Sequence, residues 1–186
     1  MKILPLFAIS IVALAYLVAA SPAQARTWYI TPDGTGDAPT IQAGIDSAVA
    51  GDIVELACGT YYEQWIQLKG GITLRSTSNN YECATIDGDG WGIFNATMVY
   101  PRSYIEGITL ANGQSAISCN HIDSIVDITN CWIENMNNTA IHCDQGFFRF
   151  FNCVFVSNHS NGSASLAQNT WFGSTHFYNC TIVDNF

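Results

Sequence analysis

Three side chains with acid–base chemistry follow or interrupt short apolar runs of the kind that form strands. They are Asp87, His142 and Asp144. If Asp87 and Asp144 lie two coils apart on one sheet face, their separation is about 10 Å. That slightly exceeds the roughly 6.5–9.5 Å between the carboxyl groups of inverting glycosidases. His142, two residues before Asp144, would share this face. The same residues also fit a polar sheet face that only meets water.

Two further residues are candidates for contact with a ligand. Asn120 is expected beside Asp87 and Asp144 on the same face, and Trp132 is expected at an outward strand position. The face of an aromatic ring stacks on sugar rings, so these residues suit a saccharide. No metal site is expected, because no C-x-x-C pair occurs and the four histidines are scattered. No cofactor is expected either.

The elements that must position these residues repeat along the chain. One phrase occurs four times, with its Gly or Asn at Gly107, Asn130, Asn152 and Asn179, at spacings of 23, 22 and 27 residues. This range is typical of one coil in a stacked solenoid. Gly and Asn both tolerate a left-handed backbone, so each residue marks a bend between two short strands.

The register of this phrase predicts three columns of strands. The first is expected at residues 53–56, 85–86, 116–119, 140–143 and 164–167, the second at 65–68, 104–105, 125–128, 147–150 and 175–177, and the third at 72–74, 108–110, 131–133, 153–155 and 180–182. Three strands per coil and about five coils predict an all-β fold, a parallel β-helix solenoid. An antiparallel β-sandwich is the alternative, but it predicts no such register.

A short helix is expected before the first strand. From Thr40 to Val49 the apolar residues fall on one helical face, and Thr40 is a suitable N-cap. Such a helix would cover the open N-terminal end of the stack, as terminal caps do in solenoids.

The N-terminus predicts export. Lys2, a mostly apolar run from Ile3 to Ala20 and the sequence Ala23-Gln24-Ala25 form the three parts of a signal peptide, so residues 1–25 are assigned to the signal and 26–186 to one β-helix domain. An uncleaved membrane anchor is the alternative; after cleavage no membrane span is expected.

Cleavage leaves five basic against fifteen acidic residues, a formal charge of −10. This charge argues against nucleic acid as a partner.

The seven cysteines divide into two groups. Cys58 and Cys83 fall in loops of adjacent coils, outside the columns, and are the disulfide candidate. The others occupy inward positions, where parallel side chains point alike rather than toward each other, so small apolar core residues are expected. They are Cys119, Cys131, Cys143, Cys153 and Cys180.

Several segments resemble the right-handed parallel β-helix, or pectin-lyase-like, superfamily. They are Pro39-Thr40-Ile41-Gln42-Ala43-Gly44-Ile45-Asp46, Gly51-Asp52-Ile53-Val54, Cys58-Gly59-Thr60-Tyr61-Tyr62-Glu63 and Thr85-Ile86-Asp87-Gly88-Asp89-Gly90. The resemblance implies a right-handed β-helix over residues 27–186, with any catalysis or binding on outward residues of the first column. It does not imply one activity, because this fold hosts many functions.

The motifs of enzymes in this superfamily are mostly missing. A pectate-lyase-like site needs a carboxylate cluster for calcium and a basic residue, for which Arg149 is the best placed. The Asn-Thr-Asp, His-Gly and Arg-Ile-Lys motifs of polygalacturonases do not occur. A second resemblance, to the repeats of polymorphic outer-membrane adhesins, is carried by Phe155-Val156-Ser157-Asn158 together with residues 115–117 and 139–141.

The sequence therefore predicts a secreted or cell-surface β-helix that acts as a binding scaffold, for a polysaccharide or cell-surface glycan or for adhesion. The alternative is a polysaccharide lyase or glycoside hydrolase, with Asp87, His142, Asp144 or Arg149 as catalytic groups. The chain ends just after a third-column strand with no capping element, so the domain is expected to be incomplete at its C-terminus.

Overall fold

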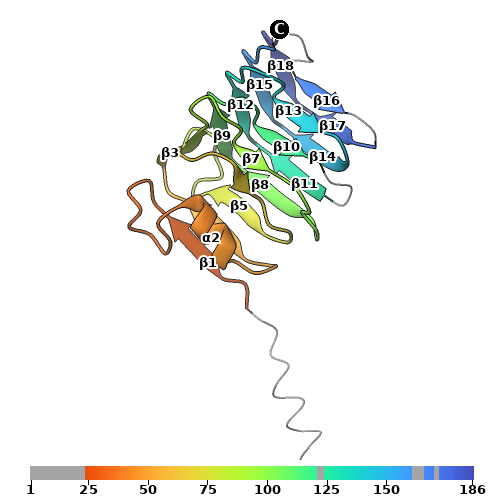
Figure 1. The fold of residues 1–186 in the computed structure, drawn as a ribbon. Helices are drawn as coiled ribbons and strands as arrows, with labels where there is room; N and C mark the ends of the chain where they lie inside the picture. Colours follow the sequence, from red (N-terminus) through yellow and green to blue (C-terminus); the bar gives the residue numbers. More distant parts are fainter. Residues whose placement is uncertain (1–23, 121–123, 161–165, 170–171) are drawn as a thin grey trace, which may run out of the picture.

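The backbone winds into a solenoid made of stacked turns. A computed structural model describes residues 24–120, 124–160, 166–169 and 172–186 (Figure 1). These residues form a β-solenoid of about six turns with three parallel sheets, so the predicted right-handed parallel β-helix is confirmed. The number of turns is about six rather than the predicted five.

Each turn adds one strand to each sheet, and we name the sheets A, B and C. Sheet A consists of β1 (Thr27–Ile30), β2 (Ile53–Leu56), β5 (Thr73–Ser76), β8 (Ser103–Glu106), β11 (Ser124–Thr129), β14 (Gly146–Phe151) and β17 (Ser174–Tyr178). Sheet B consists of β3 (Gly59–Tyr62), β6 (Ala84–Asp87), β9 (Ile108–Ala111), β12 (Trp132–Glu134), β15 (Val154–Val156) and β18 (Thr181–Val183). Sheet C consists of β4 (Ile66–Gln67), β7 (Phe94–Asn95), β10 (Ile117–Cys119), β13 (Ile141–Cys143) and β16 (Ala167–Asn169).

The predicted columns are right for the later turns and wrong for the first two. From β8 onward the first, second and third columns correspond to sheets C, A and B. In the earlier turns, residues 53–56 and 72–74 belong to sheet A, 85–86 to sheet B and 65–68 to sheet C. The cause is the length of these turns: Ile53 pairs with Thr73 after 20 residues, and Thr73 pairs with Tyr104 after 31. Both lengths fall outside the 22–27 residues from which the columns were predicted.

The repeated Gly or Asn is a left-handed bend between sheets A and B, as predicted. The φ angles are 63° at Gly107, 53° at Asn130 and Asn152, and 57° at Asn179. The Asn179 side chain donates from Nδ2 to Oδ1 of Asn152 at 3.3 Å, one turn away. The bend at Asn179 therefore stacks on the equivalent bend at Asn152 in the preceding turn, and this stacking helps to keep successive turns in register.

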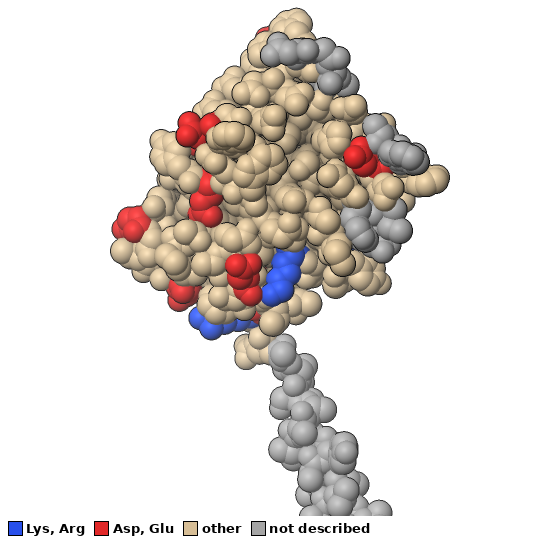
Figure 2. All heavy atoms as spheres, viewed as in Figure 1, with Lys and Arg blue, Asp and Glu red and all other residues tan. Residues whose placement is uncertain are grey.

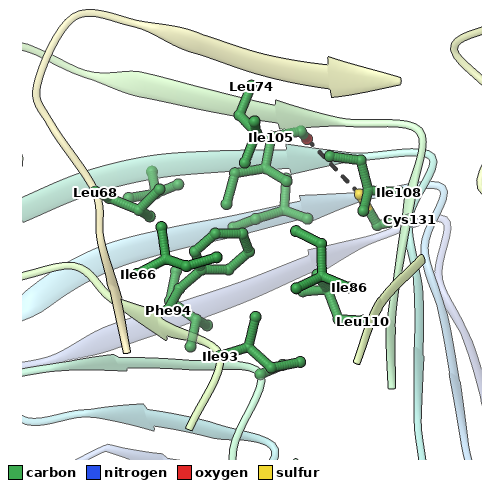
Figure 3. Packing of buried hydrophobic residues seen from close by; sticks show 14 of the residues in the cluster. Ile66, Leu68, Leu74, Ile86, Ile93, Phe94, Ile105, Ile108, Leu110 and Cys131 are labelled. Carbon is green, nitrogen blue, oxygen red and sulfur yellow. Dashed lines mark hydrogen bonds between the residues drawn. The ribbon is translucent and has the colours of Figure 1, made fainter. Parts of the chain in front are cut away.

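The core is a column of apolar side chains enclosed by the three sheets. In Figure 3, Ile66 and Phe94 of sheet C point toward Leu74 and Ile105 of sheet A. Within a strand the inward residues are buried and the outward ones are not, as in β10 and β13. This alternation is what a strand with one face on the core requires.

A short helix covers the N-terminal end of the stack, as predicted. Helix α2 (Ile41–Ser47) begins after Thr40, whose hydroxyl accepts a hydrogen bond from the Ala43 N–H at 3.1 Å. Its buried face, which includes Ile41 and Ile45, packs on β1 and β2. No helix among the described residues is long and apolar enough to cross a membrane. The signal peptide assigned to residues 1–25 lies almost wholly outside the described residues, which begin at Gln24.

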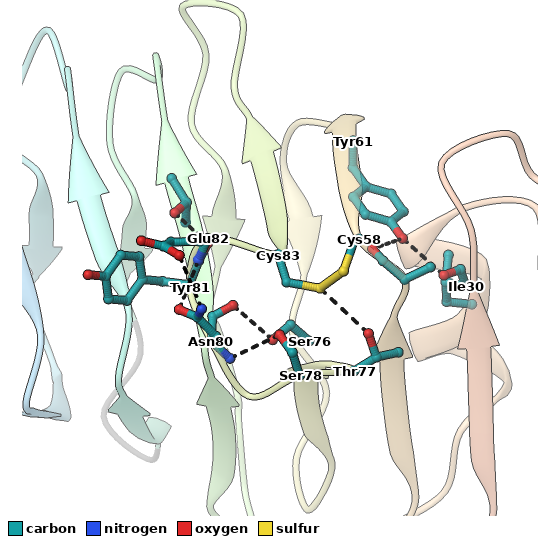
Figure 4. The surroundings of a disulfide bond; sticks show 12 residues. Ile30, Cys58, Tyr61, Ser76, Thr77, Ser78, Asn80, Tyr81, Glu82 and Cys83 are labelled. Atoms are coloured by element: carbon teal, nitrogen blue, oxygen red, sulfur yellow. Dashed lines mark hydrogen bonds between the residues drawn. A yellow bond between two sulfur atoms is a disulfide. The ribbon is translucent and has the colours of Figure 1, made fainter.

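A disulfide joins Cys58 and Cys83, the pair singled out from the sequence (Figure 4). The two residues precede β3 and β6, which are adjacent in sheet B, and their Cα atoms are 4.4 Å apart. Beside the disulfide, the Tyr61 hydroxyl donates to the carbonyl oxygens of Ile30 and Ala57, at 2.9 Å each. The disulfide therefore joins the short bend between β2 and β3 to the longer bend between β5 and β6.

The other five cysteines are thiols, and four of them are buried in the core. Cys131 and Cys153 donate from Sγ to backbone carbonyl oxygens of the preceding turn, at 3.8 Å and 3.5 Å. Burial raises the pKa of Cys143 to about 11. Such thiols are poor nucleophiles near neutral pH, because the thiolate is the reactive form.

We expect Asn152→Ala to lower the free energy of unfolding by about 1 kcal/mol, because Ala pays the steric cost of a left-handed backbone. Asn152→Gly is the matched control: it loses the same side-chain hydrogen bond but adopts this backbone readily. Urea denaturation of both variants measures the difference. Equal losses would show that the bend conformation contributes nothing.

We also expect the four buried thiols, Cys119, Cys131, Cys143 and Cys153, to resist a thiol-specific reagent in the folded protein near neutral pH. Cys180 is only partly buried and serves as the internal reference. Mass spectrometry after labelling, with and without denaturant, locates the modified residues. Rapid labelling of Cys143 in the folded protein would contradict this account.

Candidate functional site: a polar groove on sheet C

The outward face of sheet C carries one continuous row of polar side chains. Strand pairing aligns Gln67 with Asn95, Asn95 with Ser118, Ser118 with His142, and His142 with Gln168. Neighbouring strands are about 4.8 Å apart, so the row places one amide, hydroxyl or imidazole group at each step along the solenoid. The neighbouring residues on these strands point inward, are apolar and pack in the core, which fixes the position of the row.

A groove with a volume of about 300 Å³ lies over the part of this row formed by Ser118, His142 and Gln168. Trp65 lines it from the turn before β4, and Asn120 and Asp144 line it from the ends of β10 and β13. The remaining lining residues are Gln114, Ser115, Ser118, Asn138, Thr139, His142 and Gln168. The described lining residues therefore offer many hydrogen-bonding groups and one broad aromatic side chain, and none of them is a lysine or arginine.

His142 and Asp144 form the acid–base pair of the groove. Nε2 of His142 is 3.3 Å from Oδ1 of Asp144, and the two side chains are 34% and 29% exposed. The backbone N–H of Asp144 donates to the carbonyl oxygen of Cys119 at 2.9 Å, which fixes the turn that carries the carboxylate. The pair can accept or relay a proton and can bind hydroxyl groups. The structure thus brings together His142, Asp144 and Asn120.

Asp87 does not belong to this site, and its predicted place in the row was wrong. It ends β6 in sheet B, where it aligns with Ala111 rather than with a residue of sheet C. Its carboxylate accepts hydrogen bonds from Nδ2 of Asn112 at 2.8 Å and from the N–H of Asp89 at 2.9 Å. Asp87 therefore stabilises a bend, and the predicted pair of carboxylates with Asp144 does not form.

Arg149 also lies away from the groove, on the outward face of β14 in sheet A. Its Nε donates to Oδ1 of Asp127 at 2.8 Å, and Arg102 lies 3.6 Å from the same carboxylate. The hydrogen bond that Arg149 donates to the Asp127 carboxylate raises the pKa of Arg149 above its usual value. A guanidinium held in this way is protonated and cannot serve as a base.

Trp132 is outward on sheet B, as predicted, but it faces a separate depression of about 390 Å³. Its indole Nε1 donates to Glu134 at 2.9 Å, and its ring lies 5.2 Å from that of Tyr81. The residue is therefore held in a fixed orientation against its neighbours, on a different sheet from His142 and Asn120.

Sequence reasoning missed Trp65, the groove residue that comes from the first turns. Trp65 was not recognised as lining the groove, and Gln67 and Asn95 were not recognised as members of the row, because the columns were out of register there. The available signal was the alternation in Trp65-Ile66-Gln67-Leu68, in which Ile66 and Leu68 are buried and the other two are exposed.

Metal ligands do not gather in the described part of the chain, where no three His, Cys, Asp or Glu side chains are placed to hold an ion. Acidic side chains are scattered over the face seen in Figure 2, and most of that face is uncharged. The described lining of the groove is suited to hydrogen bonding and ring stacking.

Comparison with known proteins identifies the fold. No protein-family model and no curated protein matches this chain. Among solved structures, a mutant of a PL6-family alginate lyase is similar, with a TM-score of 0.57 and 14% sequence identity. The similarity covers 89% of this chain but only 26% of the lyase chain, so this chain spans about a quarter of that protein. The chain therefore has the right-handed parallel β-helix fold that is also found in this polysaccharide lyase.

Proposed function

We propose that this protein is an exported glycan-binding β-helix and that the polar groove on sheet C is its binding site. The observation that carries the proposal is the in-register row from Gln67 to Gln168. Its steps of about 4.8 Å are close to the length of one pyranose ring. An extended glycan lying along the row would meet one polar side chain per sugar, and Trp65 offers a ring on which a sugar can stack.

Charge favours a neutral glycan over an acidic one. Among the described residues that line the groove, Asp144 is acidic and none is a lysine or arginine that would offset its charge. The whole chain carries a formal charge of −9. A uronate polymer would be repelled by both the groove and the surrounding surface, whereas a neutral polysaccharide would not.

Export is supported by three features. The N-terminal sequence has the pattern of a signal peptide, and the chain contains a disulfide between Cys58 and Cys83. Structural disulfides persist in oxidising compartments outside the cytosol. Only 11% of the residues are charged, so the surface is largely neutral and polar, as suits contact with extracellular saccharides.

Binding to a panel of neutral and acidic polysaccharides tests this proposal. We expect Trp65→Ala to raise the Kd for a neutral glycan about tenfold, the effect of losing ~1.4 kcal/mol of ring stacking. Calorimetric titration measures the change. The matched control is Trp132→Ala, which removes an indole from sheet B and should leave the Kd unchanged. If Trp132→Ala abolishes binding while Trp65→Ala does not, the glycan binds to sheet B and the groove proposal is wrong.

A polysaccharide lyase is the second candidate function. The His142–Asp144 pair at 3.3 Å is an observation in its favour, since a histidine oriented by a carboxylate is a common general base. The similar solved structure is titled as an alginate lyase. Against this reading, no arginine or lysine lines the groove to neutralise the carboxylate of a uronate as its neighbouring proton is removed.

We expect no unsaturated product when the protein is incubated with alginate, pectate or neutral polysaccharides, as followed by ultraviolet absorbance. The decisive comparison is with His142→Ala and Asp144→Asn. If the unaltered protein forms product and both variants lose it by about 10²–10⁴-fold while they still bind the polymer, the protein is a lyase. The binding-only proposal would then be replaced.

A further inference from the structure

A buried carboxylate lies where the chain enters the solenoid. Asp52 directly precedes β2 and is 5% exposed. Its Oδ1 accepts a hydrogen bond from the backbone N–H of Arg26 at 2.8 Å. Its Oδ2 accepts from the N–H of Val49 at 3.0 Å and from the indole of Trp28 at 3.2 Å. All three donors are neutral groups, and the positive charge of Arg26 adds an electrostatic attraction that is smaller than the hydrogen bonds.

The charged side chains around Asp52 are engaged elsewhere. The guanidinium of Arg26 lies 3.6 Å from the centre of the Trp28 ring. Lys69 donates to the carbonyl oxygens of Asp46 and Ala48, at 3.1 Å and 2.6 Å, and the Asp46 carboxylate accepts from Gln42. On β2 and β5, Glu55 and Arg75 pair with each other at 2.6 Å. Among the described residues, no salt bridge reaches Asp52.

The backbone of Arg26 is held on both sides. Its N–H donates to Asp52, and its carbonyl oxygen accepts from the N–H of Ile53 at 2.9 Å. The next residue, Thr27, already pairs with Ile53 in the first strand pair of sheet A. Among the described residues, which begin at Gln24, Arg26 is therefore the first whose main chain is held by hydrogen bonds to the fold.

We propose that Asp52 binds the α-ammonium group that is created when the chain is cut between Ala25 and Arg26. The signal-peptide pattern independently places cleavage at this bond. Hydrolysis by a signal-processing protease breaks the peptide bond with one water molecule, leaving a carboxylate on Ala25 and an amine on Arg26 that takes up a proton. The new charge arises on the nitrogen that already lies 2.8 Å from Asp52, so the ion pair forms without rearrangement.

The electrostatics of Asp52 suit this role. Hydrogen bonds from the N–H groups of Arg26 and Val49 lower the pKa of its carboxyl, so the group is ionised near neutral pH. An adjacent carboxylate raises the pKa of an α-amine, which is about 7.7–8.0 when unperturbed. Where Asp52 is ionised, the stabilisation is therefore complete up to about pH 7.7, and it is lost as the pH rises through the raised pKa of the amine.

Two forms of the exported protein test the proposal. One begins at Arg26, and the other retains Gln24 and Ala25, which preserves the Arg26 N–H but moves the charged amine two residues away. We expect the longer form to melt about 2–4 °C lower near neutral pH. Asp52→Asn is made in both forms, and the difference between them should then vanish. Mass spectrometry of the protein exported with its own signal should show Arg26 as the first residue.

A second measurement covers the case in which Asp52→Asn does not fold. The pKa of the Arg26 α-amine, followed by NMR in the folded protein that begins at Arg26, should lie above the value of the unfolded chain. Equal melting temperatures for the two forms, an α-amine pKa that does not rise on folding, or a mature N-terminus other than Arg26 would each overturn the proposal. None of these measurements depends on whether the groove binds a glycan.

Discussion

Register between successive turns is the constraint on which this structure depends. In a parallel solenoid each strand finds its hydrogen-bond partners only in the turns before and after it. Every turn must therefore place its three strands beside the three strands of the previous turn, whatever the number of residues in the turn. The left-handed bends at Asn130, Asn152 and Asn179 meet this requirement in the later turns. The Cys58–Cys83 disulfide joins two adjacent strands of sheet B in the early ones.

Because successive turns are in register, residues at equivalent positions form rows along the solenoid, and these rows differ in the interactions that their side chains make. Asp87, Asn112 and Asn135 lie on successive turns and bond to one another, at 2.8 Å and 3.4 Å. Their polar groups are used to hold the bend. The row through Ser118, His142 and Gln168 instead faces an open groove. The two rows therefore differ in whether their polar side chains bond to one another, and an acidic residue in a row is not by itself a catalytic sign.

The sequence predicts the parts of this fold that are encoded locally. An Asn at a left-handed bend has its own conformational reason to be there, so the later turns and the residues they carry, Asn120, His142 and Asp144, were placed correctly. The turns of 20 and 31 residues follow no local rule, because pairing between distant strands decides their register. This explains both the misplaced Asp87 and the missed Trp65.

The N-terminal cap and the groove are physically connected. Strand β4 is an edge strand of sheet C, and the side chain of Gln42 on helix α2 accepts a hydrogen bond from the Gln67 N–H at 2.7 Å. The Gln42 side chain thus accepts a hydrogen bond from a backbone N–H of the edge strand. Lys69 in turn donates to the carbonyl oxygen of Ala48, at the C-terminal end of the helix. Trp65, which lines the groove, directly precedes this strand, so the cap lies next to one end of the groove. Anchoring of the chain at Asp52 acts on the same cap, because Val49 follows helix α2 and donates to that carboxylate.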